Sequence, residues 1–196
     1  MLLDDVLPDF DVTRVDAVVI RAPAEDVYRI ACDVDLVEVV REDRLVGTLF
    51  ALRSIPDDIL RRLRRSAPAP EVASMRLSDL GDEGEWIRLG EDPGREFVFG
   101  AAGRFWNGPI QWNRIARVSF ADAAAPGTAR IAANLAVHPY SRDRVLLTYE
   151  ARTAAADGDS RAGVQRYWWF LSPFIGVVLR SVLRAVKRRA EAGARP

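Results

Sequence analysis

The sequence predicts an α+β fold in which a curved antiparallel sheet grips one long C-terminal helix. Between residues 72 and 153, apolar residues recur mainly at every second position, and turn sequences separate the runs. Between residues 160 and 191 they recur at helical spacing, while charged residues fall on another sector of the helix. The apolar positions of this helix are Val164, Trp168, Leu171, Ile175, Val178, Val182 and Val186.

The first half of the domain is expected to hold one strand followed by two shorter helices. Residues 11–21 are rich in Val and Ile, and they end at an Ala-Pro pair. Residues 24–31 then form a predicted helix, because a proline suits the first helical turn and two acids suit its positive end. A second helical segment is predicted from about Leu36 to Leu63, with a break at residues 53–56.

An alanine- and proline-rich linker at residues 66–70 precedes the remaining strands. Strong turn sequences at residues 81–84 and 92–94 indicate an antiparallel meander. The predicted strands are residues 72–80, 85–90, 96–102, 113–120, 128–137 and 144–153.

The last strand predicts which of its faces is buried. Val145, Leu147, Tyr149 and Ala151 alternate with Leu146, Thr148, Glu150 and Arg152. We expect the first set to face inward and Glu150 and Arg152 to form an exposed pair. If their face lines the grip instead, a Glu150 of raised pKa could act in acid–base chemistry. After this strand, Asp157 is a possible cap for the final helix.

Length and composition limit the class of protein. The 196 residues are about half hydrophobic, which predicts one domain at residues 11–191, an arm lying on it at residues 1–10, and a flexible tail at residues 192–196. Because the net charge is zero, no nucleic-acid partner is expected. The single cysteine excludes an intrachain disulfide, and the N-terminus lacks a signal-peptide layout, so we expect a cytoplasmic location.

No catalytic constellation is visible. His138 is the only histidine, and we expect it in an exposed turn between two strands, with a role at a pocket mouth as the alternative. Cys32, beside Asp33, is expected to be a small buried side chain. One histidine, one cysteine and scattered carboxylates offer no metal-ligand spacing, so we expect no metal and no cofactor.

The order of elements resembles the START-like helix-grip superfamily (SRPBCC, polyketide cyclase/dehydrase-like), in particular a bacterial branch of it. The segments that carry this resemblance are residues 19–28, 52–56, 103–106, 147–152 and 166–168. The resemblance implies a cavity between sheet and C-terminal helix that takes lipids, sterols, polyketides or other apolar molecules. Since a fold does not determine a function, the implied ligand is a class of molecule only.

The first function hypothesis is binding or transport of a small hydrophobic ligand in this cavity. The side chains expected to line it are Phe97, Phe99, Trp106, Trp112, Leu135, Leu147, Tyr149, Val164, Trp168, Leu171 and Ile175, although aromatic residues could equally fill a core. The alternative is a cyclase- or dehydratase-type enzyme acting on a polyketide-like substrate, in which Glu150 or Tyr149 transfers a proton.

A second alternative is a protein that associates with a membrane surface. Basic residues of the C-terminal helix, such as Arg180 and Arg184, follow an aromatic segment, although a solvated helix face would explain them too. The 13 uncharged residues 167–179 are too few to span a bilayer, which needs roughly 20. Pro173 within this run predicts a kink. The sequence does not predict an oligomeric state.

Overall fold

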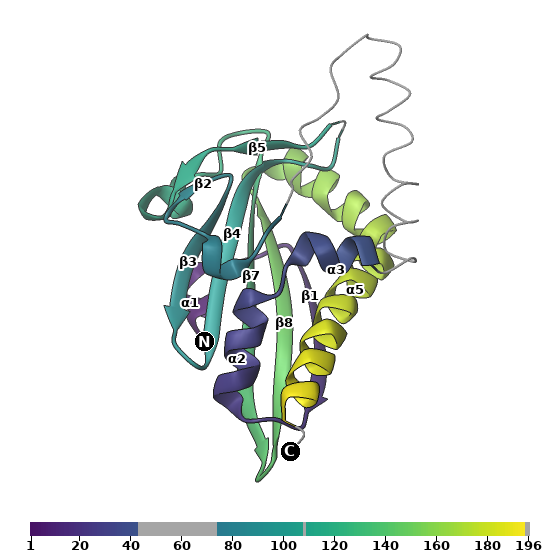
Figure 1. The fold of residues 1–196 in the computed structure, drawn as a ribbon. Coiled ribbons are helices and arrows are strands. Elements are labelled where there is room, and N and C mark those ends of the chain that lie inside the picture. The colour runs from purple at the N-terminus through teal and green to yellow at the C-terminus, as the bar shows by residue number, and fades with distance from the viewer. Residues whose placement is uncertain (43–73, 108, 195–196) are drawn as a thin grey trace.

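The computed structural model describes residues 1–42, 74–107 and 109–194, and it has the α+β architecture that the sequence predicts (Figure 1). The helices are α1 (Leu2–Val6), α2 (Ala24–Asp33), α3 (Leu36–Glu42) and α5 (Gly158–Gly193), with 3-10 turns η1 (Leu77–Asp79) and η2 (Arg117–Asp122). The strands are β1 (Val12–Ile20), β2 (Glu83–Gly84), β3 (Trp86–Asp92), β4 (Glu96–Arg104), β5 (Gln111–Asn113), β6 (Ile115–Ala116), β7 (Ala129–Ser141) and β8 (Arg144–Ala155).

The main sheet has six antiparallel strands and is not closed. Its order is β1-β8-β7-β4-β3, and β5 pairs with the end of β4. The first strand pairs with the last along its whole length, from Val12 opposite Thr153 to Ile20 opposite Val145. A separate pair of short strands, β2 and β6, lies beside the main sheet. The first and last strands of the domain therefore lie side by side, and α5 packs along both of them.

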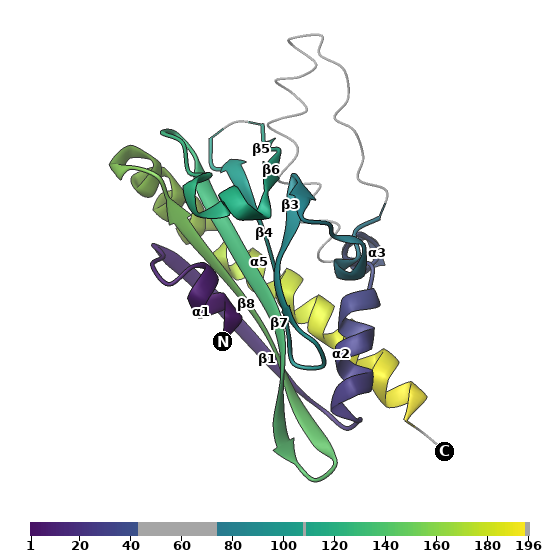
Figure 2. The same cartoon turned by 90° about the vertical axis from the view of Figure 1, so that its left-hand side faces the viewer.

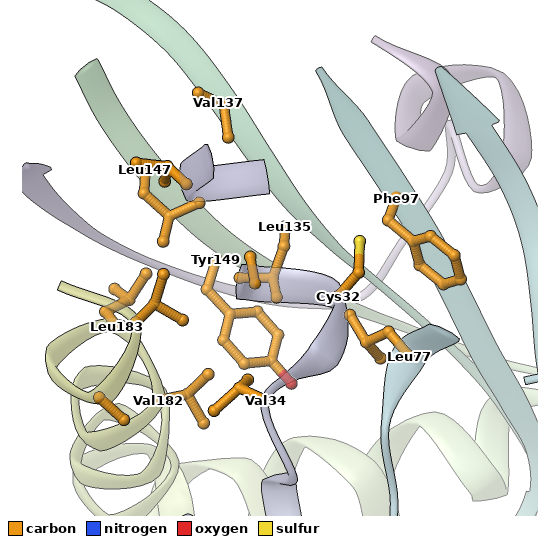
Figure 3. Close-up of a cluster of buried hydrophobic side chains, with 14 of the residues drawn as sticks. Cys32, Val34, Leu77, Phe97, Leu135, Val137, Leu147, Tyr149, Val182 and Leu183 are labelled. Carbon is orange, nitrogen blue, oxygen red and sulfur yellow. The ribbon is translucent and has the colours of Figure 1, made fainter. Parts of the chain in front are cut away.

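The two faces of the sheet carry different helices. The long helix α5 packs against β1, β8, α2 and α3, whereas α1 packs against β3, β4 and β7. Figure 2 shows α1 on one side of the sheet and α2 on the other. The helix-facing core joins Leu135, Leu147 and Tyr149 of the sheet to Val182 and Leu183 of α5 (Figure 3).

The second core lies under α1. Leu3 and Leu7 are both almost fully buried, and they pack with Ile87, Val98 and Phe120. Residues 1–10, predicted to be an arm lying on the domain, include a helix that covers the outer face of the sheet. This arm contributes a hydrophobic core of its own.

The terminal helix has the predicted N-cap and the predicted change of course, but not the predicted end. Asp157 is the N-cap, because its Oδ1 accepts a hydrogen bond from the Ser160 amide at 2.7 Å. The helix extends two residues beyond the predicted end, to Gly193. Figure 1 shows α5 changing direction near its middle, where its only proline, Pro173, removes a backbone donor.

Two predicted strands are wrong in the part of the chain that the structure describes. The described part of residues 72–80 contains the turn η1, which is anchored by the buried Leu77. Of residues 113–120, only Ile115–Ala116 forms a new strand, and η2 then inserts Phe120 into the second core. In each segment a tight turn buries one side chain. Alternation of apolar and polar residues over so few positions therefore wrongly suggests a strand.

His138 does not lie in a turn. Strand β7 continues to Ser141, and His138 pairs in register with Leu146 of β8, so the hairpin is longer and its loop shorter than predicted. Its Nε2 lies 3.3 Å from the Thr148 hydroxyl. Of the helix predicted from Leu36 to Leu63, α3 is the described part; the rest, with its break and the linker at 66–70, lies outside the described residues.

Candidate functional site

An unbroken series of aromatic contacts runs along the helix-facing side of the sheet. Tyr149 meets Phe99 at a ring-centroid distance of 6.2 Å, Phe99 meets Trp86 at 6.0 Å, and Trp86 meets Trp112 at 5.2 Å. Trp112 meets Phe105 at 5.6 Å. Phe105 also contacts the rings of Trp106 at 5.2 Å and Tyr167 at 5.6 Å. We call this set the aromatic row: Tyr149, Phe99, Trp86, Trp112, Phe105, Trp106 and Tyr167.

The aromatic row follows from strand alternation, register and two glycines. Phe99 and Tyr149 occupy inward positions of β4 and β8, and pairing of Trp86 with Ala101 brings β3 alongside. Gly103 pairs with Trp112, and a Cβ at Gly103 would lie 2.2 Å from a β5 carbonyl oxygen. At the other end Gly163 of α5 lets the Trp106 indole lie against the helix backbone. These glycines allow the bulky rings to fit.

Tyr149 supplies the one polar atom at the inner end of the row. Its side chain lies among apolar neighbours that include Val34, Leu135 and Val182, as Figure 3 shows. The residue is 9% exposed, and its hydroxyl makes no hydrogen bond among the described residues; the oxygen keeps some accessible surface, since the fully enclosed unpaired atoms of the described residues are Arg130 Nε and Thr153 Oγ1. Burial raises its pKa above the ordinary value for tyrosine, so the hydroxyl stays protonated and can donate one hydrogen bond.

The predicted lining residues fall into three groups. Six belong to the helix-facing core or pack against it: Phe97, Phe99, Leu135, Leu147, Tyr149 and Ile175. Trp106, Trp112 and Val164 gather with Phe105 in a smaller cluster near the start of α5. The remaining two, Trp168 and Leu171, line grooves on the outside of α5. The aromatic row links the first group to the second.

The predicted lining set omits Trp86, although this residue connects the two clusters. Trp86 is half-buried and packs against the helix-facing core. Alternation along β3 places Trp86 on the same face as the charged Arg88. Because this face carries both an apolar and a charged residue, the pattern alone does not show whether it points inward. The pairing of β3 with β4 decides its orientation, and a single sequence does not reveal strand register.

Glu150 lies on the opposite face of β8 from Tyr149. Its Oε1 accepts a hydrogen bond from Arg152 Nε at 2.6 Å, and Arg152 also donates to Asp4 at 2.7 Å and to the Leu7 carbonyl at 3.2 Å. Only 7% of Arg152 is exposed, so the prediction of an exposed pair is wrong: α1 covers it. The pair holds the N-terminal arm and is remote from the aromatic row.

A separate groove of about 770 Å³ lies between α2 and the β3–β4 turn. There the Tyr28 hydroxyl donates to Glu91 Oε1 at 2.8 Å, and Phe97 and Leu80 form an apolar wall. Desolvation raises the pKa of the Cys32 thiol to about 11, so this side chain is protonated at neutral pH, as expected of a structural cysteine. The described residues contain no cluster of three or more His, Cys, Asp or Glu side chains suited to a metal ion.

An open antiparallel sheet, two helices after its first strand and a long C-terminal helix across one face together define a helix-grip fold. No family model matches the sequence, and no curated protein matches it.

Several solved structures match at low identity. A norcoclaurine synthase point mutant from Thalictrum flavum, in complex with a transition-state analogue, is 10% identical over 94% of this chain and 98% of that one, with a TM-score of 0.44. A conserved protein from Geobacillus kaustophilus is 11% identical over 90% and 96%, with a TM-score of 0.39. The di-domain ARO/CYC protein BexL of the BE-7585A biosynthetic pathway is 17% identical, with a TM-score of 0.40; the match covers 94% of this chain and 48% of BexL.

Proposed function

We propose that the protein binds a small, uncharged hydrophobic molecule along the aromatic row, and that the Tyr149 hydroxyl donates a hydrogen bond to a polar atom of that molecule. The observation that carries this proposal is the Tyr149 hydroxyl itself. It makes no hydrogen bond among the described residues, and it lies at one end of a series of rings. A ligand acceptor would give this hydroxyl a hydrogen bond that contributes about 0.5–1.5 kcal/mol.

The rings also favour a class of ligand. Trp86 and Trp112 are half-buried, unlike Phe99 and Phe105, so part of each indole is left uncovered by protein. Aromatic surfaces pack well with flat apolar molecules, and no residue of the row carries a charge. A molecule with at least one ring and one carbonyl or ether oxygen therefore fits these features best.

Tyr149 is better suited to binding than to proton abstraction. Its raised pKa disfavours the phenolate, and Glu150, the other candidate for proton transfer, faces away from it. A cyclase-type reaction would need a second proton-transfer group beside Tyr149. The binding proposal requires only the donor and the apolar surface.

The first experiment is native mass spectrometry of the protein purified from its own host, followed by denaturing extraction and identification of any released molecule. A defined neutral molecule containing a ring is the expected result. Its affinity should fall about 3- to 10-fold in Tyr149→Phe, since one neutral hydrogen bond contributes about 0.5–1.5 kcal/mol. Trp86→Leu should weaken binding as well.

Tyr140→Phe is the matched control, because this tyrosine is 60% exposed at the end of β7 and should bind as the wild type does. Unchanged affinity in both Tyr149→Phe and Trp86→Leu would place the ligand elsewhere. An empty protein, combined with no thermal shift across a panel of ring-containing lipids and polyketides, would contradict the proposal.

A further inference from the structure

The first half of α5 exposes an unusual amount of aromatic surface. Trp169 and Phe170 are each 77% exposed, and their rings contact each other at a centroid distance of 5.1 Å. They lie in the run of residues 167–179, which contains no charged side chain. Arginines end this run on both sides, at positions 166 and 180. Exposed apolar surface of this kind commonly marks an interaction site.

One side of α5 combines these rings with basic residues. At 3.6 residues per turn, a sector of about 100° contains Arg166, Trp169, Phe170, Pro173, Val177, Arg180, Arg184 and Arg188. We call this set the outer stripe. No Asp or Glu occurs between residues 160 and 190, so the stripe has no acidic neighbour on its own helix over that length.

Several arginines of the outer stripe are free to meet an anion. Arg166, Arg184 and Arg188 have no acidic partner among the described residues. Arg180 pairs with Asp16 at 3.2 Å, but Arg14 pairs with the same carboxylate at 3.1 Å, so this trio keeps a net positive charge. The stripe therefore presents cations around an apolar centre.

Trp169 and Phe170 form an aromatic ridge on α5, and the surfaces beside this ridge have the same character. A groove of about 670 Å³ lies on one side of the ridge, where Arg104 and Arg166 outnumber Asp159. A second groove of about 710 Å³ lies on the other, between Trp168 or Trp169 and the guanidinium groups of Arg14 and Arg180. The ridge is thus flanked by positive charge on both sides.

We propose that the outer stripe of α5 docks on an anionic lipid bilayer. Trp169 and Phe170 enter the boundary between headgroups and acyl chains, while the arginines contact anionic headgroups. Charge complementarity selects this occupant, because the cations flank exposed rings that favour the membrane interface. The proposal goes beyond ligand binding and stands on different residues from the aromatic row.

The docked helix lies on the bilayer and does not cross it. By length and composition alone α5 could span a membrane. However, Leu179, Val182 and Val186 of its second half are buried in the helix-facing core. The uncharged run extends only about 20 Å as a helix, whereas the hydrocarbon layer is about 30 Å thick. Contact in the plane of the interface satisfies both observations.

The test is co-sedimentation with vesicles of phosphatidylcholine, with and without phosphatidylserine, at low and high salt. Binding should require phosphatidylserine and weaken with salt. The double variant W169S/F170S should bind at least about tenfold more weakly, and R184Q/R188Q should lose the dependence on phosphatidylserine. Val118→Ser removes a side chain that is 93% exposed on η2, and this control should bind as the wild type does.

Thermal unfolding checks that the variants are folded, since the replaced side chains are exposed. Absence of phosphatidylserine-dependent binding, or full binding by W169S/F170S, would overturn the proposal. Sedimentation velocity adds one further outcome: a wild-type dimer that becomes monomeric in W169S/F170S, without vesicle binding, would assign the stripe to a second copy. Tyr149→Phe should bind vesicles normally, so failure of ligand binding and failure of docking are distinguishable.

Discussion

Tyr149 and Glu150 are adjacent in the sequence and face opposite sides of β8. The Tyr149 ring packs in the helix-facing core, while the Glu150 carboxylate accepts a hydrogen bond from Arg152 beneath the N-terminal arm. One strand thus carries a candidate ligand donor on one face and the anchor of α1 on the other. The two faces can be perturbed independently, and the predictions below use this separation.

The first prediction is that Tyr149→Phe does not destabilise the free protein and changes its free energy of unfolding by less than about 1 kcal/mol. The substitution removes a hydroxyl that makes no hydrogen bond among the described residues and keeps some accessible surface, and it leaves the ring and its contacts in place. Urea unfolding of the ligand-free protein measures the change. The exposed Tyr140→Phe should leave the free energy of unfolding unchanged. A loss of stability in Tyr149→Phe would show that the hydroxyl is already bonded in the free protein.

The second prediction concerns the anchor of the arm. Arg152→Leu should lower the free energy of unfolding by about 3 kcal/mol, because it leaves Glu150 with little exposure and no cation and frees the Leu7 carbonyl. Arg144→Leu on the same strand is the control, since Arg144 is 44% exposed and should cost less than about 1 kcal/mol. Equal losses in urea unfolding would argue against a special role for the buried arginine.

These two residues also show how far the sequence predicts the fold. Alternation along β8 correctly identifies Tyr149 as inward, because one face of this strand is densely apolar. The same alternation cannot show what lies over the other face. Burial of Arg152 depends on α1, a helix of five residues that is too short to produce a recognisable period.

The candidate site is predictable to a similar extent. Helical spacing groups Trp168 and Leu171 with Val182 and Val186, but it only shows that these residues share one face of the helix. That face is buried where another element covers it, which happens along the second half of α5. Trp86 is missed for the complementary reason, because strand register places it in the aromatic row. Which part of a helix another element covers and how two strands pair both depend on residues far apart in the sequence. Local patterns therefore reveal neither of them.

A third prediction tests the fit between α5 and the aromatic row. Gly163→Ala should lower the melting temperature although alanine favours helices, because the new Cβ would lie 2.4 Å from the Trp106 indole. Displacement of that ring should also change tryptophan fluorescence. Gly158→Ala, near the start of the same helix, has no atom within 4 Å of its new Cβ and should be neutral or slightly stabilising. Identical behaviour of the two variants would show that Trp106 shifts at no cost.

The last prediction concerns acid stability. Asp35 accepts hydrogen bonds from the Ser74 hydroxyl at 2.6 Å and from the Met75 amide at 3.2 Å, which join α3 to the chain before η1. The Ser74 bond is the main reason that the pKa of Asp35 falls from its ordinary 3.8 to about 2.

A lowered pKa means that the folded protein binds this proton less readily than the unfolded chain does. Asp35 therefore contributes up to about 2 kcal/mol above pH 4, and this contribution is lost as the pH falls toward 2. Ser74→Ala should raise the pKa of Asp35 and reduce the stability lost across that window, as carboxyl NMR titration and urea unfolding at each pH would measure. Ser78 is an exposed serine on η1, so Asp35 should titrate in Ser78→Ala as it does in the wild type. An unchanged Asp35 pKa in Ser74→Ala would mean that the backbone amides alone hold the carboxylate ionised.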